Sequence, residues 1–442
     1  MKILVFNQYF YPEVASSAQI LTELCEDLAR AGHSVTVICG MPSYRRREEM
    51  TVTELETRKV KELPSGSAVG RAISFLLSLS PSWLLEGEKV LGINILRVYT
   101  YAPILSTSKW RYIQRMLQYI SYFLFSLPIA FLCPKANVVL YLSTPPLLNG
   151  ITANLIKLFK GTPNIFNIQD LYPDIAINLG VIKEGVLTKP LYLIEKFLYE
   201  GAQYIIPIGF LMERALLEKK VPPDKIRIIP NWMDTEQIRP LGKNNSFAKE
   251  HRLLDKFVVM YSGNIGLSQG LENVLRAAAK LKDINDLLFL FIGGGENLQR
   301  LKMMAEELEL DNVRFLPYQP KSRLSESLSS AEVHLLTLKR GLSKFSVPSK
   351  IYGIMASARP VIAAVDSEGE IAEMVRKAAC GMVVEPENPQ ALAEAIRSLY
   401  NDREKLDLMG MNGRNYLEQK STRKICVTKY IELFDKVANT NR

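Results

Sequence analysis

A lysine lies at the predicted start of a short helix in the sequence VPSKIYGIMASARPVIAA, residues 347–364. Pro348 and Ser349 are residue types that begin helices, and Pro360 leads into an apolar segment typical of a buried strand. The first N–H groups of a helix have no partner within it and favour anions, so Lys350 beside them would strengthen a phosphate site. Taken alone, the stretch favours a simpler alternative, a Ser cap followed by a solvated lysine.

Glycine-rich turns elsewhere in the chain favour the phosphate site. The sequence SGNIGLSQGLENVLRAA (262–278) follows an apolar strand and opens a helix, and its glycines would let backbone N–H groups approach a diphosphate closely. GGGEN (293–297) is a second such turn, and PYQP (317–320) places an aromatic ring after the next strand, which suits a nucleobase. These loops together predict a nucleoside-diphosphate site. The residues expected there are Gly263, Gly266, Gly294, Gly295, Tyr318, Ser349 and Lys350.

Short apolar runs alternate with amphipathic stretches along the chain, which is the pattern of parallel sheets covered by helices on both faces. The alternation stops at a polar segment, 231–251, interpreted as an interdomain linker, and then starts again. We therefore predict two doubly wound α/β domains, 1–235 and 236–420, with ligands beyond the C-terminal strand ends. A final helical segment, 421–442, is expected to pack back on the first domain. The expected strands are 2–7, 34–39, 137–142, 164–169, 203–208, 226–230, 257–263, 287–295, 312–318, 332–338, 361–364 and 381–386.

Composition limits the class of protein. The chain has 442 residues, of which 48% are hydrophobic and 23% charged, as expected of two globular domains. The net charge of +9 would suit nucleic acid, an anionic membrane or an anionic substrate, but the basic residues are scattered and no nucleic-acid-binding motif is visible. The five Cys and three His are far apart, which argues for a reducing compartment and against a metal site. The N-terminus turns polar too early for a signal peptide.

Two apolar segments do not fit a plain soluble enzyme. Residues 116–134 carry no charge and approach the length of a spanning helix, and residues 72–85 form a second apolar run. A spanning helix would separate the strands at 34–39 and 137–142, whereas a helix lying in the membrane interface would not. Together with the basic sequence SYRRRE (43–48), these segments predict attachment to a membrane surface. An ordinary core helix is the alternative.

The order of these motifs resembles glycosyltransferase family 4, the retaining sugar-nucleotide transferases of the GT-B fold, over nearly the whole chain. Within that family the sequence looks most like the transferases that build bacterial capsule, O-antigen and exopolysaccharide units on a polyprenyl carrier. The resemblance implies two Rossmann-like domains facing across a cleft, a UDP- or GDP-linked hexose or N-acetylhexosamine donor, a polyprenyl-diphosphate-linked or glycan acceptor, and no cofactor. The motifs that carry it are YFYPE, LARAGHSVTV, STPPL, QDLYPD, IIPNWMD, YSGNIG with QGLE, FIGGG, FLPYQP, VPSKIYGIMASARPVIA and GEIAEMV.

The sequence departs from family 4 at its usual Glu-x7-Glu pair. The second Glu, which holds the ribose in the family, falls on Gly353, and the first falls on Phe345. Glu368 and Glu370, at the start of the next helix, could take over the ribose contact.

A second departure lies at the first glycine turn, where the family has an Arg and a Lys. The matching positions are Asn264 and Gln269, and we expect these to contact the donor instead. A degenerate, inactive site is the alternative, but the retained SVPSKIYG sequence and the glycine turns argue against it.

Carboxylates of the first domain are the candidates for the acceptor side. By the resemblance, Asp170 projects into the interdomain cleft, where it could orient the acceptor hydroxyl or stabilise the sugar cation; a helix-capping role is as good an interpretation. Glu13, Asp174 and Arg46 are further candidates on that side. Backbone N–H groups, helix ends and Lys350 would stabilise the departing diphosphate without a metal.

The sequence therefore predicts a bacterial glycosyltransferase, peripheral on the cytoplasmic face of the plasma membrane. Its partners would be a nucleotide sugar, a lipid-linked or glycan acceptor and the membrane surface, and not nucleic acid. Two alternatives stay open. One is a sugar-nucleotide 2-epimerase, which shares the GT-B architecture and would need no apolar surface, and the other is a non-catalytic membrane scaffold.

Overall fold

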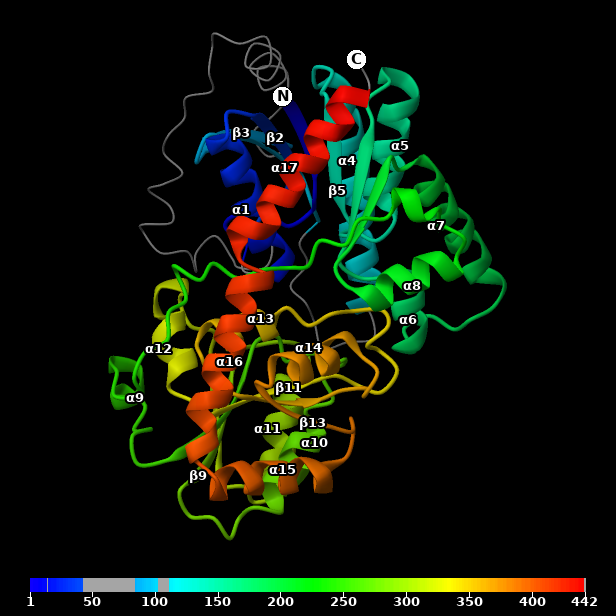
Figure 1. Cartoon of the computed structure of the whole chain (residues 1–442). Helices are drawn as coiled ribbons and strands as arrows, with labels where there is room; N and C mark the ends of the chain where they lie inside the picture. Colours follow the sequence, from blue (N-terminus) through cyan, green and yellow to red (C-terminus); the bar gives the residue numbers. More distant parts are fainter. Residues whose placement is uncertain (14, 43–83, 102–110, 441–442) are drawn as a thin grey trace.

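The computed structural model describes residues 1–13, 15–42, 84–101 and 111–440, which form two α/β domains stacked one above the other (Figure 1). Each domain is built on one mainly parallel sheet with helices on both faces, which confirms the fold predicted from the alternation of strands and helices.

The N-terminal sheet has seven strands in the order β3-β4-β2-β1-β5-β6-β7. Successive residues of the central strand β1 enter different cores, because side chains alternate along a strand. Ile3 and Val5 pack with residues of α1 and α17, whereas Leu4 and Phe6 pack with residues of α4 and α5. The elements are β1 Lys2–Phe6, α1 Ser16–Arg30, β2 Ser34–Gly40, β3 Leu85–Val90, β4 Ile93–Val98, α4 Arg111–Leu132, β5 Val138–Leu142, α5 Leu148–Lys160, β6 Asn164–Ile168, α6 Asp174–Asn178, η3 Val186–Thr188, α7 Lys189–Gly201, β7 Tyr204–Pro207, α8 Phe210–Glu218 and η4 Pro223–Lys225.

The C-terminal sheet has six strands in the order β10-β9-β8-β11-β12-β13, all parallel. The elements of the second half of the chain are α9 Ser246–Glu250, β8 Phe257–Ser262, α10 Glu272–Ala279, β9 Leu287–Ile292, α11 Leu298–Glu307, β10 Val313–Leu316, η5 Lys321–Arg323, α12 Leu324–Ser329, β11 Val333–Thr337, α13 Lys350–Ala356, β12 Val361–Ala364, α14 Glu370–Ala378, β13 Gly381–Val384, α15 Pro389–Asn401, α16 Glu404–Lys420 and α17 Arg423–Thr440.

Two expectations about the elements were wrong, and two strands were not predicted. Residues 226–230 are not a strand: they run beside β7 through the bridge of Ile226 with Ile205 and hydrogen bonds from the Arg227 and Ile229 amides to the carbonyls of Ile205 and Pro207, and the pairing goes no further because Pro207 and Pro230 have no N–H to donate. The segment 231–251 is not all linker, since Lys243 pairs with Glu332 at 2.6 Å and α9 packs on α12. The expected strands also lack β3, a polar strand, and β4, its antiparallel partner, which is fully buried.

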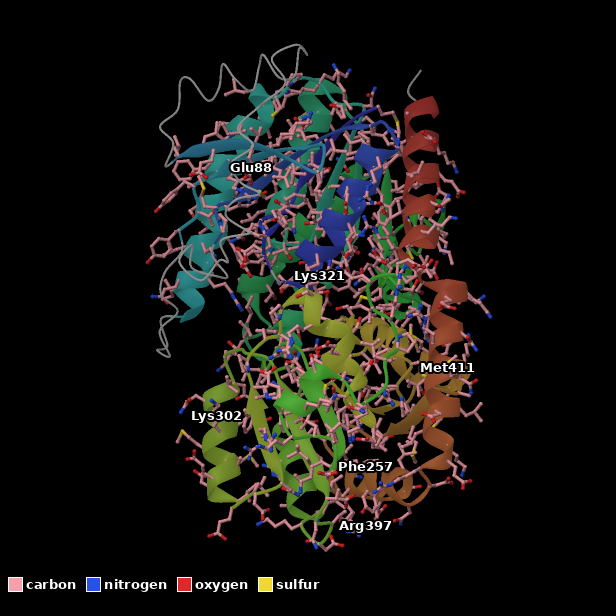
Figure 2. All side chains as sticks on the ribbon, turned by 90° about the vertical axis from the view of Figure 1, so that its left-hand side faces the viewer. Glu88, Phe257, Lys302, Lys321, Arg397 and Met411 are labelled. Carbon is pink, nitrogen blue, oxygen red and sulfur yellow. The ribbon has the colours of Figure 1, made fainter. Side chains whose placement is uncertain are left out.

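The chain crosses between the domains at two adjacent places. Met233 forms a bridge with Thr422, and the next residue, Arg423, pairs with Glu26 at 2.8 Å and with Asp27 at 2.7 Å. From this point α17 runs back along the N-terminal domain, against α1 (Figure 1). On the same helix α1, Glu23 pairs at 3.0 Å with Lys321 of the C-terminal domain, which lies where the domains meet (Figure 2).

Helix α4 contains most of the predicted apolar segment 116–134. One face packs on the sheet, where the Tyr122 hydroxyl donates a hydrogen bond to the carbonyl of Ile38 at 2.9 Å. The opposite face is exposed, with Met116 at 60% and Leu124 at 58% of their full accessible surface. By length and composition, residues Ile113–Leu132 could also span a membrane. The second predicted segment, 72–85, lies outside the described residues except for its last two positions.

Candidate active site

The two glycine turns lie side by side at the ends of β8 and β9. The Ile265 amide donates to the carbonyl of Gly294 at 2.8 Å, and the Gly263 amide donates to the carbonyl of Ile292 at 2.9 Å. Gly293 has φ +148°, and a Cβ there would overlap the carbonyl oxygen of Gly263. The turns can approach this closely because neither has a side chain at the contact, which leaves a backbone surface facing the other domain.

Lys350 lies beneath the first of these turns. Its ammonium nitrogen is 3.5 Å from the ring centroid of Tyr261, and a Cβ on Gly263 would lie 3.4 Å from it. The nitrogen is buried and has no hydrogen-bond partner. Burial lowers the pKa of Lys350 well below its ordinary value. A buried cation with only an aromatic face beside it is costly unless an anion joins it.

The structure contradicts the simpler interpretation of this helix start. Ser349 makes no side-chain capping bond; its hydroxyl lies 2.7 Å from that of Ser16 in the N-terminal domain. Lys350 is not solvated either. Ser349 therefore faces the N-terminal domain, whereas Lys350 is buried under the first turn.

Asn264 and Gln269, which stand where family 4 has basic residues, shape the first turn. The Gly266 amide donates to the side-chain oxygen of Gln269 at 2.9 Å, and the Tyr261 hydroxyl donates to the carbonyl of Asn264 at 2.6 Å. The side chain of Asn264 lies 2.9 Å from where a Cβ of Gly266 would be. These contacts fix the turn by local hydrogen bonds and leave Lys350 as the cation directly beneath it.

Tyr318, in the loop after β10, packs against the second turn. Its hydroxyl donates to the carbonyl of Gly294 at 3.2 Å, and its ring would lie 3.3 Å from a Cβ on Gly294. A Cβ on Gly295 would lie 2.5 Å from the carbonyl oxygen of Ile265. The ring remains 37% exposed, so a flat base has access to it.

The positions of the missing Glu pair are occupied in different ways. A Cβ on Gly353 would lie 3.3 Å from the Met233 methyl, so this position faces the domain crossover. The carbonyl of Phe345 accepts a hydrogen bond from the Leu171 amide at 3.1 Å. Asp170 forms a bridge with Ser346, next to Phe345. An N-terminal-domain carboxylate thus lies beside the position of the missing first Glu.

The Asp170 side chain lies in a group of titratable residues. Burial raises its pKa, and a hydrogen bond with Ser346 opposes part of the rise. Burial also raises the pKa of Tyr172 and of Tyr119, and the charge of Asp170 adds to both increases. Asp170 therefore has phenolic neighbours on the N-terminal side and the loop before Lys350 on the other side.

Glu370 reaches across the domain interface. Its carboxylate accepts a hydrogen bond from the Phe210 amide, at the start of α8, at 2.6 Å. Burial raises the pKa of Glu370 to about 7, although the amides of Phe210 and Leu211 stabilise its charge. In this conformation it contacts a helix end of the N-terminal domain, and its ribose contact remains a prediction. Glu368 is exposed, two residues ahead of α14.

Of the other acceptor-side candidates, Asp174 and Glu13 lie in the described part of the chain. Asp174 pairs with Lys219 at 2.7 Å, and Lys219 also pairs with Glu195 at 2.8 Å, which is a contact that fastens α6 to α7 and α8. Glu13 is buried just ahead of α1. Arg46 lies outside the described residues.

The sequence analysis gave no role to Arg115, which directly precedes the apolar segment 116–134. Arg115 is exposed to solvent, yet it interacts with Tyr119 on α4, with Tyr9 after β1 and with Glu296 of the second glycine turn. The available signal was its spacing from Tyr122, which puts both on one face of the helix.

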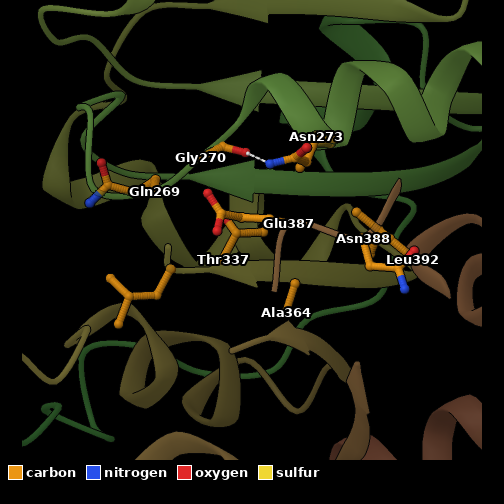
Figure 3. Close-up of a pocket in the computed structure, with 10 residues that line it drawn as sticks. Gln269, Gly270, Asn273, Thr337, Ala364, Glu387, Asn388 and Leu392 are labelled. Carbon is orange, nitrogen blue, oxygen red and sulfur yellow. Dashed lines mark hydrogen bonds between the residues drawn. The ribbon is translucent and has the colours of Figure 1, made fainter. Parts of the chain in front are cut away.

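A small pocket lies behind the first turn and shares Gln269 and Gly270 with it (Figure 3). Its volume of about 10 Å³ has room for about one water molecule. The buried Thr337 hydroxyl, which lines it, has no hydrogen-bond partner. The pocket therefore suits an ordered water and is too small for a nucleotide.

Comparison with known proteins gives two family models and related sequences. Residues 17–232 match a glycosyl transferase 4-like domain, and residues 242–416 match glycosyl transferases group 1. WcaI of Escherichia coli K12, a glycosyl transferase named for colanic acid biosynthesis, is 26% identical over 90% of this chain and 91% of its own length. WbjE of Pseudomonas aeruginosa, named as a glycosyltransferase, is 29% identical over 70% of this chain and 76% of its own.

Solved structures share the fold at low sequence identity. A sucrose-phosphate synthase from Thermosynechococcus elongatus has a TM-score of 0.71 at 17% identity, with both chains fully covered. HepE of Anabaena, in complex with UDP-glucose, has a TM-score of 0.70 at 14% identity over 99% of this chain and 100% of its own. The two family models between them account for most of both domains, and the chain belongs to family 4 of the GT-B glycosyltransferases.

Proposed function

We propose that this protein transfers a sugar from a nucleotide sugar to a lipid-linked acceptor in the assembly of a bacterial cell-surface polysaccharide, with retention of the anomeric configuration. The observation that carries the proposal is the buried, unpartnered ammonium of Lys350 beneath a glycine turn. The named role of WcaI in colanic acid biosynthesis supports the polysaccharide assignment.

The donor would bind on the backbone surface of the two turns. Its diphosphate would lie against the turn amides and Lys350, and its base against the ring of Tyr318. In the transfer, the bond between the sugar C1 and the diphosphate oxygen breaks, and a bond from C1 to the acceptor oxygen forms. The acceptor proton passes to the departing diphosphate, whose charge Lys350 and the amides stabilise.

Asp170 would act on the acceptor side. Its carboxylate lies beside the loop that leads to Lys350, so it can orient the acceptor hydroxyl or stabilise positive charge at C1. We expect no divalent metal to be needed, and activity that persists in a chelator would agree with this. Activity lost in chelator and restored by magnesium would contradict it.

We further propose that the enzyme works at a membrane surface, through the exposed face of α4. That face carries Ile113, Met116, Leu117, Ile120 and Leu124, spaced along one side of the helix. The inner face is fixed to the sheet through Tyr122, which favours a helix that lies in the interface.

Vesicle sedimentation tests the membrane proposal. Leu117→Ser with Leu124→Ser should release the protein from anionic vesicles, because both side chains lie on the exposed face. The matched control is Leu408→Ser with Met411→Ser on α16, two apolar residues exposed on the C-terminal domain. Equal binding of both variants would exclude the α4 face.

The central test is a thermal-shift panel of UDP- and GDP-linked sugars, followed by transfer to a prenyl-diphosphate-linked sugar and NMR of the product anomer. A bound donor stabilises the fold by mass action. Inverted product would contradict retention. Conversion of the free nucleotide sugar to its 2-epimer would favour an epimerase, and no nucleotide-sugar binding would favour a scaffold.

A further inference from the structure

The inner face of α4 continues beyond the sheet into the region between the domains. Tyr122, Ser126 and Ala130 on this face are buried against the domain. Arg115 and Tyr119 stand seven and three residues before Tyr122, so they lie on the same face, one to two turns nearer the helix start. Arg115 is nonetheless exposed, which means that this end of the face borders open space.

The neighbours of Arg115 come from both domains. Burial disfavours its charge, but Tyr119, Tyr9 and Glu296 more than offset this and raise the pKa of Arg115. Tyr172 interacts with it as well. Arg115 thus lies between the phenolic group around Asp170 and the second glycine turn. It makes no hydrogen bond or ion pair with any residue in the described part of the chain, so its guanidinium donors are available to a ligand.

We propose that Arg115, together with Tyr119 and Tyr172, binds the diphosphate of a lipid-linked acceptor. The inference rests on the proposed function and adds the acceptor-binding residues to it. A guanidinium presents paired N–H donors that match phosphate oxygens, and the two phenols are further donors. On the opposite side of the same helix, about 10 Å away, lies the apolar face of Met116, Leu117 and Ile120.

This arrangement fits an amphiphilic acceptor. The prenyl chain would lie along the outer face of α4 and the diphosphate would turn around the helix start to Arg115. The attached sugar would then reach Asp170, which interacts with both Tyr119 and Tyr172. The donor diphosphate has its own cation in Lys350, so the two diphosphates would be held by different domains.

Binding of farnesyl diphosphate tests the inference without requiring turnover. Affinity is measured for the full chain with the preferred nucleoside diphosphate at saturation, so that the donor site is filled. Arg115→Ala should weaken farnesyl diphosphate by about ten- to a hundredfold, as expected when charge-assisted hydrogen bonds are lost. Arg214→Ala, at an exposed arginine on α8, is the matched control and should leave the affinity unchanged.

Three outcomes would overturn the inference. Equal affinity in the two variants would remove Arg115 from any acceptor site. An equal loss of nucleotide-sugar affinity in Arg115→Ala would assign Arg115 to the donor site. Retained nucleotide-sugar affinity would show that the variant is folded. Inorganic diphosphate that binds as tightly as farnesyl diphosphate would exclude a lipid as the source of the phosphate. If no nucleotide sugar binds the wild-type chain, the proposed function fails separately from this test.

Discussion

Replacing Lys350 with methionine should separate stability from donor binding. Methionine keeps nearly the length of the side chain and removes its charged ammonium group. The nitrogen of that group is buried without a hydrogen-bond partner. Leaving such a group unpaired costs about 1–3 kcal/mol, and the contact with the Tyr261 ring offsets up to about 2 kcal/mol. We therefore expect Lys350→Met to leave the free energy of unfolding of the empty protein unchanged or to raise it by about 1 kcal/mol.

Donor binding should change in the opposite direction. A lost charge-assisted bond to the diphosphate corresponds to about 1.5–3 kcal/mol, or a roughly ten- to hundredfold weaker affinity. At a donor concentration of about 100 times the wild-type Kd, the wild-type protein gains about 2.7 kcal/mol from the ligand. The same concentration would stabilise Lys350→Met by only about 0.4–1.4 kcal/mol.

The assay is thermal unfolding with and without nucleoside diphosphate, nucleoside monophosphate and nucleoside. The control is Lys302→Met, an exposed lysine on α11 (Figure 2). The variant at Lys350 should lose most of its response to the diphosphate and keep its response to the nucleoside. Equal losses for nucleoside and diphosphate would refute the assignment, and so would a marked fall in the stability of the empty protein.

Two further predictions concern the turns and the domain interface. Gly293→Ala should destabilise the protein by about 2–4 kcal/mol, because the new Cβ would overlap the carbonyl of Gly263 at a φ of +148°; Gly185→Ala, where nothing lies within 4 Å of the new Cβ, should change urea unfolding little. Glu370 has a raised pKa of about 7, so the folded protein holds a proton that the unfolded chain has lost, and stability should fall as pH rises from about 4.5 to about 7, by at most about 3 kcal/mol. Glu370→Gln should remove this dependence in a series of thermal unfolding curves, Glu394→Gln at an exposed position on α15 should keep it, and a pH profile that Glu370→Gln does not alter would exclude Glu370 as the titrating group.

The fold could be predicted from the sequence because its signals are local. Continuous apolar strands such as LLFLFI at 287–292 have few other interpretations, and they locate both sheets. The prediction missed the buried strand β4, INILRV, and it also failed where burial does not follow apolarity. Strand β3, LEGEKV, is a polar edge strand whose pairing partner β4 and turn at Gly92 supply its stability. Residues 226–230 are buried in part and donate two backbone hydrogen bonds to β7, yet they form only a single bridge with it.

The donor side of the site could be predicted more fully than the acceptor side. The glycine turns and Lys350 each carry a local signature, a turn after a strand or a cation at a helix start. Arg115 has none, because its proximity to Tyr172 and Glu296 depends on where α4 begins relative to both sheets. Glu370 illustrates a different limit: its position in the sequence favours a ligand contact, which stays a prediction, whereas its hydrogen bond to a helix start in the other domain has no local signal in the sequence.

The loop before Lys350 explains why neither half of the site is complete by itself. Within six residues, 344–349, the loop makes four contacts with the N-terminal domain. They join Lys344 to Glu218, Phe345 to Leu171, Ser346 to Asp170 and Ser349 to Ser16. The placement of Lys350, the cation proposed to bind the donor, is thereby tied to the residues around the proposed acceptor position. A chain that lacks the usual Glu pair can still assemble a site in this way, because the N-terminal domain brings a carboxylate to the place where the first Glu is missing.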